Sequence, residues 1–113
     1  MIDDTRAERA VEYIRDHAKD FAKAKAERTQ IEQFLKSKKA LLMKEADAND
    51  YATAAAQERE ALADPEYIAL IDGLKVAVET EERIRWEMVA AELTVDIWRT
   101  YQANNRRMER TTS

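Results

Sequence analysis

The sequence predicts an all-α fold, and three observations lead to this class. The chain of 113 residues contains one glycine and one proline, which leaves little material for turns between strands. Its apolar residues recur in alternating steps of four and three, the spacing that places them on one face of a helix. The residues Asp-Pro-Glu-Tyr at 64–67 are typical of a helix start. We therefore expect a single domain over 1–113, folded as an elongated antiparallel hairpin of two long helices with a short helix at the turn.

The first long helix is expected over residues 3–46, with Asp3, Asp4 and Thr5 available as caps. Its apolar face thins between Phe21 and Ile31, so we expect loose or polar packing there. The residues that form this inner seam are Ala10, Ile14, His17, Phe21, Ala24, Arg28, Ile31, Leu35, Lys38 and Leu42.

The short helix is expected over residues 50–63, which are rich in alanine and would let another backbone approach closely. Asp47, Asn49 and Asp50 interrupt the apolar pattern of the first long helix and can cap the short helix that follows. The alternative is that the first helix continues through this segment. Asp64 ends it in either case, because the residue before a proline avoids the helical region.

The second long helix is expected over residues 64–108, followed by a disordered tail at 109–113. Its inner seam contains Leu70, Leu74, Ala77, Glu81, Ile84, Met88, Ala91, Val95 and Trp98. A second apolar series is rotated by about 200° from the first, so it faces away and needs another partner. We expect this series to be the interface of a homodimer or larger oligomer, packed as a coiled coil or helical bundle; its residues are Trp86, Val89, Leu93, Ile97 and Tyr101.

Two further features of the long helices carry predictions. Gly73 indicates a kink, a close helix crossing or a break, of which a close crossing is favoured. If Leu42 faces Leu70, Glu81 falls near Ile31, one turn from Arg28. Because an isolated buried charge is unfavourable, we expect Glu81 and Arg28 to pair and to fix the register of the hairpin.

The formal net charge of −4 is unevenly distributed along the chain. Residues 46–82 contain ten acids and only Arg59 and Lys75 as bases, whereas residues 83–113 contain six arginines and four acids. This segregation indicates oriented packing or partner choice. The plainer interpretation is that these charges lie on solvated helix faces.

Several classes of function find no support in the sequence. His17 is the only histidine and cysteine is absent, whereas metal sites need three or four convergent ligands, so we interpret His17 as a partly buried core residue. A phosphate-binding loop is excluded by the single glycine, and no serine stands at a motif spacing from His17. We expect no enzyme activity, cofactor or metal. No segment approaches the roughly 20 apolar residues of a membrane span, and the absence of cysteine leads us to expect a reducing cytosol as the location.

Basic residues next to aromatic side chains make single-stranded DNA a candidate partner, because such proteins combine base stacking with phosphate contacts. The isoelectric point of about 5.1 argues against a dedicated DNA-binding domain. The candidate contact residues for nucleic acid or another partner are Arg83, Arg85, Arg99, Arg106, Arg107, Lys36 and Lys39.

Three stretches together carry a family resemblance: residues 36–43 (KSKKALLM), residues 57–67 (QEREALADPEY) and residues 82–99 (EERIRWEMVAAELTVDIWR). Over about residues 30–108 the chain resembles small all-helical proteins of tailed phages and prophages, encoded near recombination (single-strand annealing) genes. The resemblance implies phage DNA metabolism in a bacterial host and supplies no catalytic residues.

These observations lead to one functional expectation and two alternatives. We expect a non-enzymatic, oligomeric helical interaction protein that is an accessory of phage recombination or replication and binds a recombination protein or helps to organise single-stranded DNA. The first alternative is an acidic helical inhibitor of a host nuclease or defence protein, in which residues 46–82 form the binding surface. The second is a purely structural packing module.

Overall fold

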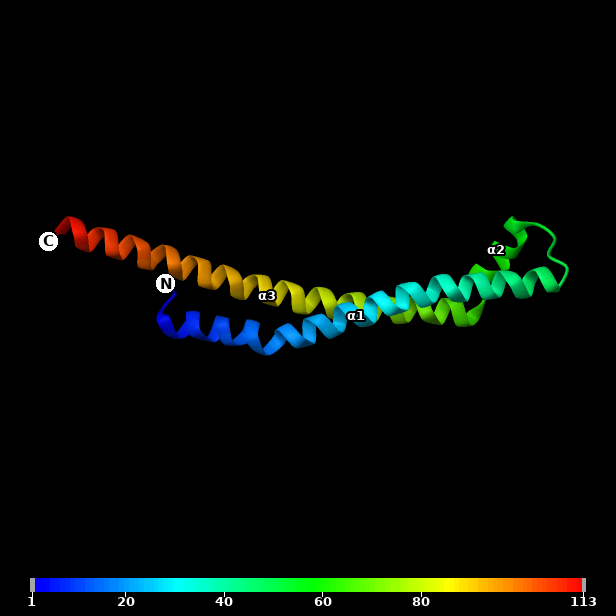
Figure 1. Ribbon diagram of the computed structural model, residues 1–113, viewed down its shortest axis with the longest axis horizontal. Helices are drawn as coiled ribbons and strands as arrows, with labels where there is room; N and C mark the ends of the chain where they lie inside the picture. Colours follow the sequence, from blue (N-terminus) through cyan, green and yellow to red (C-terminus); the bar gives the residue numbers. More distant parts are fainter. Residues whose placement is uncertain (1, 113) are drawn as a thin grey trace. The chain divides into compact units, whose positions relative to one another are not determined.

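The computed structural model describes residues 2–112, which form three helices and no strand. The long helix α1 spans Asp4–Ala48, the short helix α2 spans Ala54–Ala63, and the long helix α3 spans Pro65–Thr112 (Figure 1). This confirms the all-α class and the predicted order of a long, a short and a long helix.

Contacts divide the chain into two units, each of which is described by itself. The terminal unit comprises Met1–Ala22 and Glu82–Ser113, and the turn unit comprises Lys23–Glu81. In α1 the division falls at Ala22, just before Ala24 and Arg28, where the apolar seam thins. Loose or polar packing was predicted for this stretch of α1.

Each unit contains an antiparallel pair of helix segments. In the terminal unit Asp4 is hydrogen-bonded to Trp98, and Tyr13, further along α1, is bonded to Glu87, which comes earlier in α3. In the turn unit Arg28 pairs with Glu81, and Lys38, further along, pairs with Glu66. The α3 number falls as the α1 number rises in both units, which confirms the predicted hairpin pairing.

Side-chain caps explain where the helices begin. The Asp3 carboxylate accepts from the Arg6 backbone N–H at 2.8 Å, and the Asp64 carboxylate accepts from Glu66 N–H at 2.9 Å, as predicted for both ends. The cap of α2 is Thr53, whose Oγ1 accepts from Ala56 N–H at 3.1 Å.

The connection between α1 and α2 differs from the expectation that Asp47, Asn49 and Asp50 cap the short helix. Helix α1 ends at Ala48, so it does not continue through the short helix, and Asp50 takes a positive φ of 74° in the turn. Asp47 instead accepts a hydrogen bond from the Gln57 side chain at 3.1 Å. These residues therefore end α1 and form the turn, and α2 begins four residues later than expected, at Ala54.

The two inner seams are packed as predicted: every residue assigned to them is buried or half-buried. The most buried positions are mainly alanines, which permits a close approach of α1 and α3. Among the described residues the buried apolar set is Ala7, Ala10, Ala24, Leu42, Ala46, Ala61, Ile84 and Ala91.

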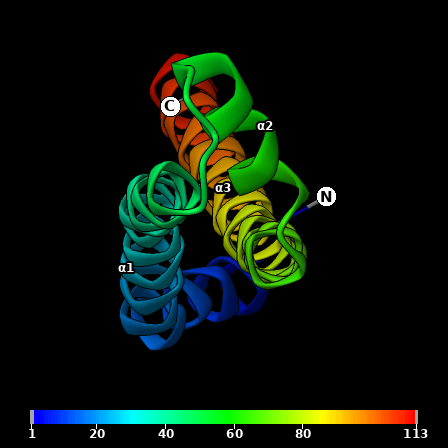
Figure 2. The same ribbon diagram turned by 90° about the vertical axis from the view of Figure 1, so that its right-hand side faces the viewer.

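Helix α2 packs through its small face within the turn unit. Ala61 is only 1% exposed, and Lys39 of α1 forms an ion pair with Glu58 of α2 at 2.8 Å. Figure 2 shows α2 beside the two long helices at this end of the chain. The alanine-rich sequence thus permits the close contact that was expected of it.

Two predictions about α3 are wrong. The helix is continuous through Gly73, and a Cβ atom placed there meets nothing within 4 Å, so Gly73 marks neither a break nor a close crossing. The expected end near Met108 is also wrong, because α3 continues to Thr112. The Thr111 hydroxyl donates to the Met108 carbonyl at 2.9 Å, and Arg110 in the last turn suits the negative end of the helix dipole. Of the predicted disordered tail, Ser113 lies outside the described residues.

Candidate interaction surface

Four large apolar side chains lie exposed in one row along α3 of the terminal unit. Trp86 is 59% exposed, Leu93 55%, Ile97 45% and Tyr101 41%. Val89, between Trp86 and Leu93, is half-buried. These five residues are the second apolar series that the sequence predicted, and we call them the outer face.

The outer face is exposed because α1 covers the opposite side of the same helix. Ile84 and Ala91 of the inner seam are buried against α1, and Trp98 donates its indole N–H to the Asp4 carboxylate at 2.8 Å. The two faces therefore have different surroundings in the terminal unit. The inner seam is packed within the chain, whereas four of the five outer-face residues stay exposed.

The arginines near the outer face differ in their surroundings. Arg85 lies over the Trp86 ring, with its guanidinium carbon 4.7 Å from the ring centroid, and forms an ion pair with Glu82 at 2.6 Å. Arg99 lies 3.7 Å from Asp96. Each of these two cations is thus balanced by a neighbouring carboxylate on the same helix.

The other arginines that were predicted as contact residues are exposed. Arg83, Arg106 and Arg107 all lie on α3 of the terminal unit. The Arg106 Nε donates to the Gln102 carbonyl at 3.4 Å. All five candidate arginines therefore belong to one helix of one unit, three of them without a carboxylate among their described ion pairs.

The two candidate lysines lie in the turn unit. Lys36 is exposed on α1, whereas Lys39 is half-buried and paired with Glu58 of α2. The pKa of Lys39 is raised above its usual value, first by its hydrogen bond to Glu58 and then by the charge of that residue. Lys39 thus stabilises the packing of α2, which a nucleic-acid contact would disturb.

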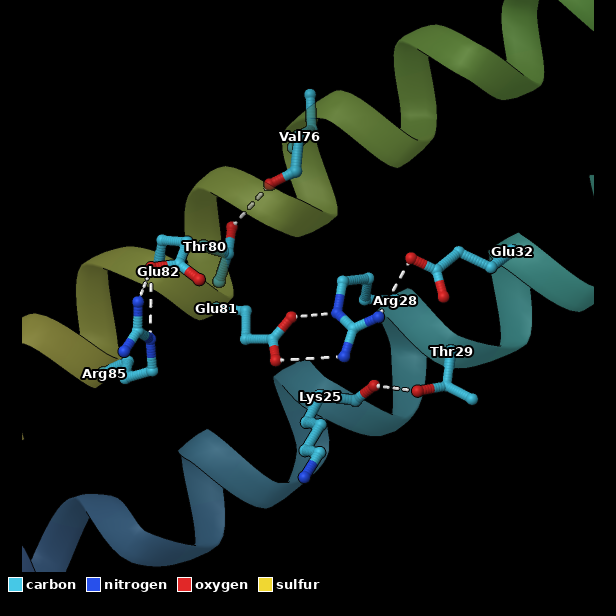
Figure 3. Close-up of polar contacts among 9 residues, drawn as sticks. All are labelled: Lys25, Arg28, Thr29, Glu32, Val76, Thr80, Glu81, Glu82 and Arg85. Atoms are coloured by element: carbon cyan, nitrogen blue, oxygen red, sulfur yellow. Dashed lines mark hydrogen bonds and ion pairs between the residues drawn. The ribbon is translucent and has the colours of Figure 1, made fainter.

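The predicted pair of Arg28 and Glu81 is present in the turn unit (Figure 3). Arg28 Nε and Nη2 both donate to the Glu81 carboxylate, the second at 3.3 Å, and Nη1 donates to Glu32 at 2.9 Å. Glu81 is 7% exposed and is the one buried charged residue of the described chain. The hydrogen bonds that Arg28 donates to Glu81 and then to Glu32 raise the pKa of Arg28, which keeps it charged opposite its partner.

Three of the ten acids in the block at 46–82 form ion pairs with basic residues of α1. Glu81 pairs with Arg28, Glu66 with Lys38, and Glu58 with Lys39, in each case across two helices. The hydrogen bond from Lys39 lowers the pKa of Glu58, and the bond to Glu66 raises the pKa of Lys38. The charge segregation along the sequence therefore supports oriented packing of the helices.

His17 is a half-buried residue of the α1 seam, as predicted. Its ring is stacked on Tyr13 with centroids 3.9 Å apart, and Nδ1–H donates to the Tyr13 carbonyl at 2.9 Å. The Tyr13 hydroxyl donates to Glu87 of α3, and this bond is the first cause of the raised pKa of Tyr13. No sequence pattern indicated this bond or the Trp98 bond to Asp4, because both depend on the register of the two helices.

Open grooves between α1 and α3 of the terminal unit are the main concavities near these residues. One of about 410 Å³ is lined by Val11, Val95 and Trp98, with charged residues at its edges. Val11 is 41% exposed and was not singled out from the sequence. No group of three potential metal ligands occurs among the residues that the structure describes, and no described helix is long and apolar enough to cross a membrane.

Comparisons with protein-family models, with curated proteins and with solved structures give no match for this chain.

Proposed function

We propose that this chain is a non-enzymatic helical interaction protein that associates with a second copy of itself through the outer face of α3. One observation carries the proposal: Trp86, Leu93, Ile97 and Tyr101 form an exposed row on a helix whose opposite side is already packed against α1. Single exposed apolar side chains are normal, but a contiguous row of large ones on one helix is typical of an interface.

The aromatic rings of the outer face offer a large apolar area to self-association. The side chains of Trp and Tyr offer about 150–250 Å² each, so exposures of 59% and 41% leave roughly 200 Å² of ring surface on one copy. Two copies would remove roughly 400 Å² from water, a gain of about 10 kcal/mol at 25 cal/mol per Å². Association itself costs about 4–15 kcal/mol, so the aliphatic residues between the rings decide the net affinity.

The proposed cellular role is that of an accessory of phage recombination or replication in the bacterial cytoplasm. The resemblance of residues 36–43, 57–67 and 82–99 to phage and prophage proteins supports this context. In this role the oligomer binds a recombination protein or helps to organise single-stranded DNA. Arg83, Arg106 and Arg107 are the exposed cations available for such contacts.

The inhibitor alternative has less support from the geometry. It needs the acidic block as a free binding surface, but Glu58, Glu66 and Glu81 pair with basic residues of α1. A partner would have to compete with these intrachain pairs. We therefore favour the outer face over the acidic block as the surface that binds a partner.

The test is light scattering of the purified protein and two variants over a range of concentrations. Leu93→Glu places a charge in the middle of the outer face, and Val76→Glu is the matched control, an exposed apolar residue on the same helix but in the turn unit. We expect a dimer or larger species for the wild type and the control, and a monomer for Leu93→Glu. A monomeric wild type, or an associated Leu93→Glu variant with unchanged helicity, would overturn the proposal.

The DNA part of the proposal has its own measurement. A fluorescent oligo-dT is titrated with the wild type and with the double variant Arg106→Gln/Arg107→Gln at low and at physiological salt. Phosphate contacts predict binding that weakens steeply as salt rises and that the double variant loses. Binding that neither salt nor these substitutions change would exclude the arginines as phosphate contacts.

A further inference from the structure

We infer that two copies pack their α3 outer faces antiparallel, centred near Leu93, so that Val89 of one copy lies against Ile97 of the other. This inference rests on the proposed self-association and specifies its geometry. It commits the outer face to a second copy of this chain, on the basis of the arrangement of apolar and charged residues along α3.

The outer face is nearly symmetric about Leu93. Val89 and Ile97 lie four residues before and after it, and the aromatic residues Trp86 and Tyr101 lie seven before and eight after it. A two-fold axis through Leu93 therefore brings apolar residues of one copy against apolar residues of the other along the whole face. The two aromatic ends supply the largest exposed area on each side of the centre.

Parallel pairing would also match apolar residues, so the charges along α3 decide the direction. Residues 82–97 contain four acids and two arginines, whereas residues 98–112 contain four arginines and one acid. Parallel pairing places the acidic residues 82–97 of one copy against the same residues of the other, and likewise the basic residues 98–112. Antiparallel pairing centred at Leu93 places residues 98–104 of one copy against residues 82–88 of the other instead of against themselves, and it also opposes the two helix dipoles.

The ends of the outer face show the same complementarity. On a helix of 100° per residue, Glu82 and Arg107 project to the same side as Leu93. In the antiparallel arrangement Glu82 of one copy comes within about one turn of Arg107 of the other, or about 5 Å along the axis. In the parallel arrangement Arg107 would face Arg107, which is unfavourable.

The absence of cysteine makes disulfide mapping a direct test. Val89→Cys and Ile97→Cys variants, one of them carrying a size tag, are mixed, oxidised by air with a copper catalyst and separated under non-reducing conditions. In the antiparallel arrangement Val89 of one copy lies about 12 Å along the axis from Val89 of the other, beyond the reach of a disulfide, whereas Val89 and Ile97 are level. Leu93→Cys reports pairing in either direction, and Val76→Cys is the control outside the outer face.

We expect the mixed disulfide between Val89→Cys and Ile97→Cys to exceed either self-disulfide by about tenfold, which corresponds to a preference of about 1.4 kcal/mol. Added salt is expected to reduce this ratio, because Arg107 is exposed and its interaction with Glu82 of the other copy would be screened. If Val89→Cys and Ile97→Cys each form self-disulfides, and Leu93→Cys also forms one, the antiparallel inference is overturned and self-association is kept. A monomer in light scattering without a Leu93→Cys disulfide would overturn both.

Discussion

Replacement of Gly73 by alanine is expected to stabilise the protein, although glycines inside elements are often retained for steric reasons. Gly73 lies in the interior of α3, is exposed, and has no atom within 4 Å of the position that a Cβ would take. Its φ is not positive, so alanine fits the backbone without strain. The gain comes from the unfolded chain, in which glycine has more freedom to lose than alanine.

The magnitude follows from helix propensity alone, because no contact is gained or lost. Alanine is favoured over glycine in a helix interior by about 0.8–1.0 kcal/mol. With a urea slope of about 1–3 kcal/mol/M, this raises the unfolding midpoint by about 0.3–1 M. Urea titration followed by far-ultraviolet circular dichroism measures the shift, and the slope should stay the same.

Ala69→Gly provides a matched control, because Ala69 is an exposed residue one turn earlier in the same helix. We expect it to lower the midpoint by about as much as Gly73→Ala raises it. A lowered midpoint for Ala69→Gly together with no change or a decrease for Gly73→Ala would refute the reasoning. It would mean that α3 is interrupted at Gly73 or that another segment occupies the space beside it.

Two further predictions concern the ion pairs and the pH dependence of stability. Arg28→Glu and Glu81→Arg should each destabilise the turn unit by placing like charges opposite each other across the seam, and the double variant should recover part of the loss. A loss of urea midpoint in the double variant equal to the sum of the two single losses would contradict this pairing. The folded-state pKa values of Tyr13, Lys38 and Lys39 are raised by hydrogen bonds to Glu87, Glu66 and Glu58. The stability that these bonds contribute is complete below the ordinary pKa values of about 10 and is lost as pH rises through the folded-state pKa values. The urea midpoint of unfolding should therefore fall above about pH 10, and it should fall less in the Tyr13→Phe variant. Equal falls in the wild type and the variant would exclude the Tyr13 bond.

The sequence predicted the helices and the inner seams because both depend on local rules. Periodicity assigned residues such as Ile14 and Ile84 to the packed side, and capping chemistry placed the start of α3 at Asp64. Even the pairing of Arg28 with Glu81 followed, since two polar residues of opposite sign interrupted two apolar seams that had to face each other.

The predictions that went wrong depended on information that local rules do not contain. Asp47, Asn49 and Asp50 have the residue types of a helix cap, but the turn uses them, and Thr53 caps α2. Gly73 was assigned a crossing because glycine is unfavourable in a helix, yet the space beside it is open. The bonds of Tyr13 to Glu87 and of Trp98 to Asp4 depend on the exact register of α1 against α3 in the terminal unit, which the spacing of the apolar residues does not determine.

The distribution of charge and apolar surface favours α3 of the terminal unit as the surface that a partner would cover. In the turn unit, basic residues of α1 and acids of the 46–82 block meet within the chain, and these pairs set the direction and register of the helices. On α3 of the terminal unit, Trp86, Leu93, Ile97 and Tyr101 stay exposed in one row, and Arg106 and Arg107 lie exposed beyond the bond of Gln102 to Asp4. An apolar row flanked by acids at one end and arginines at the other is best complemented by a surface with the same arrangement in the opposite direction. A second copy of the same helix, turned end to end, meets this requirement without any further component.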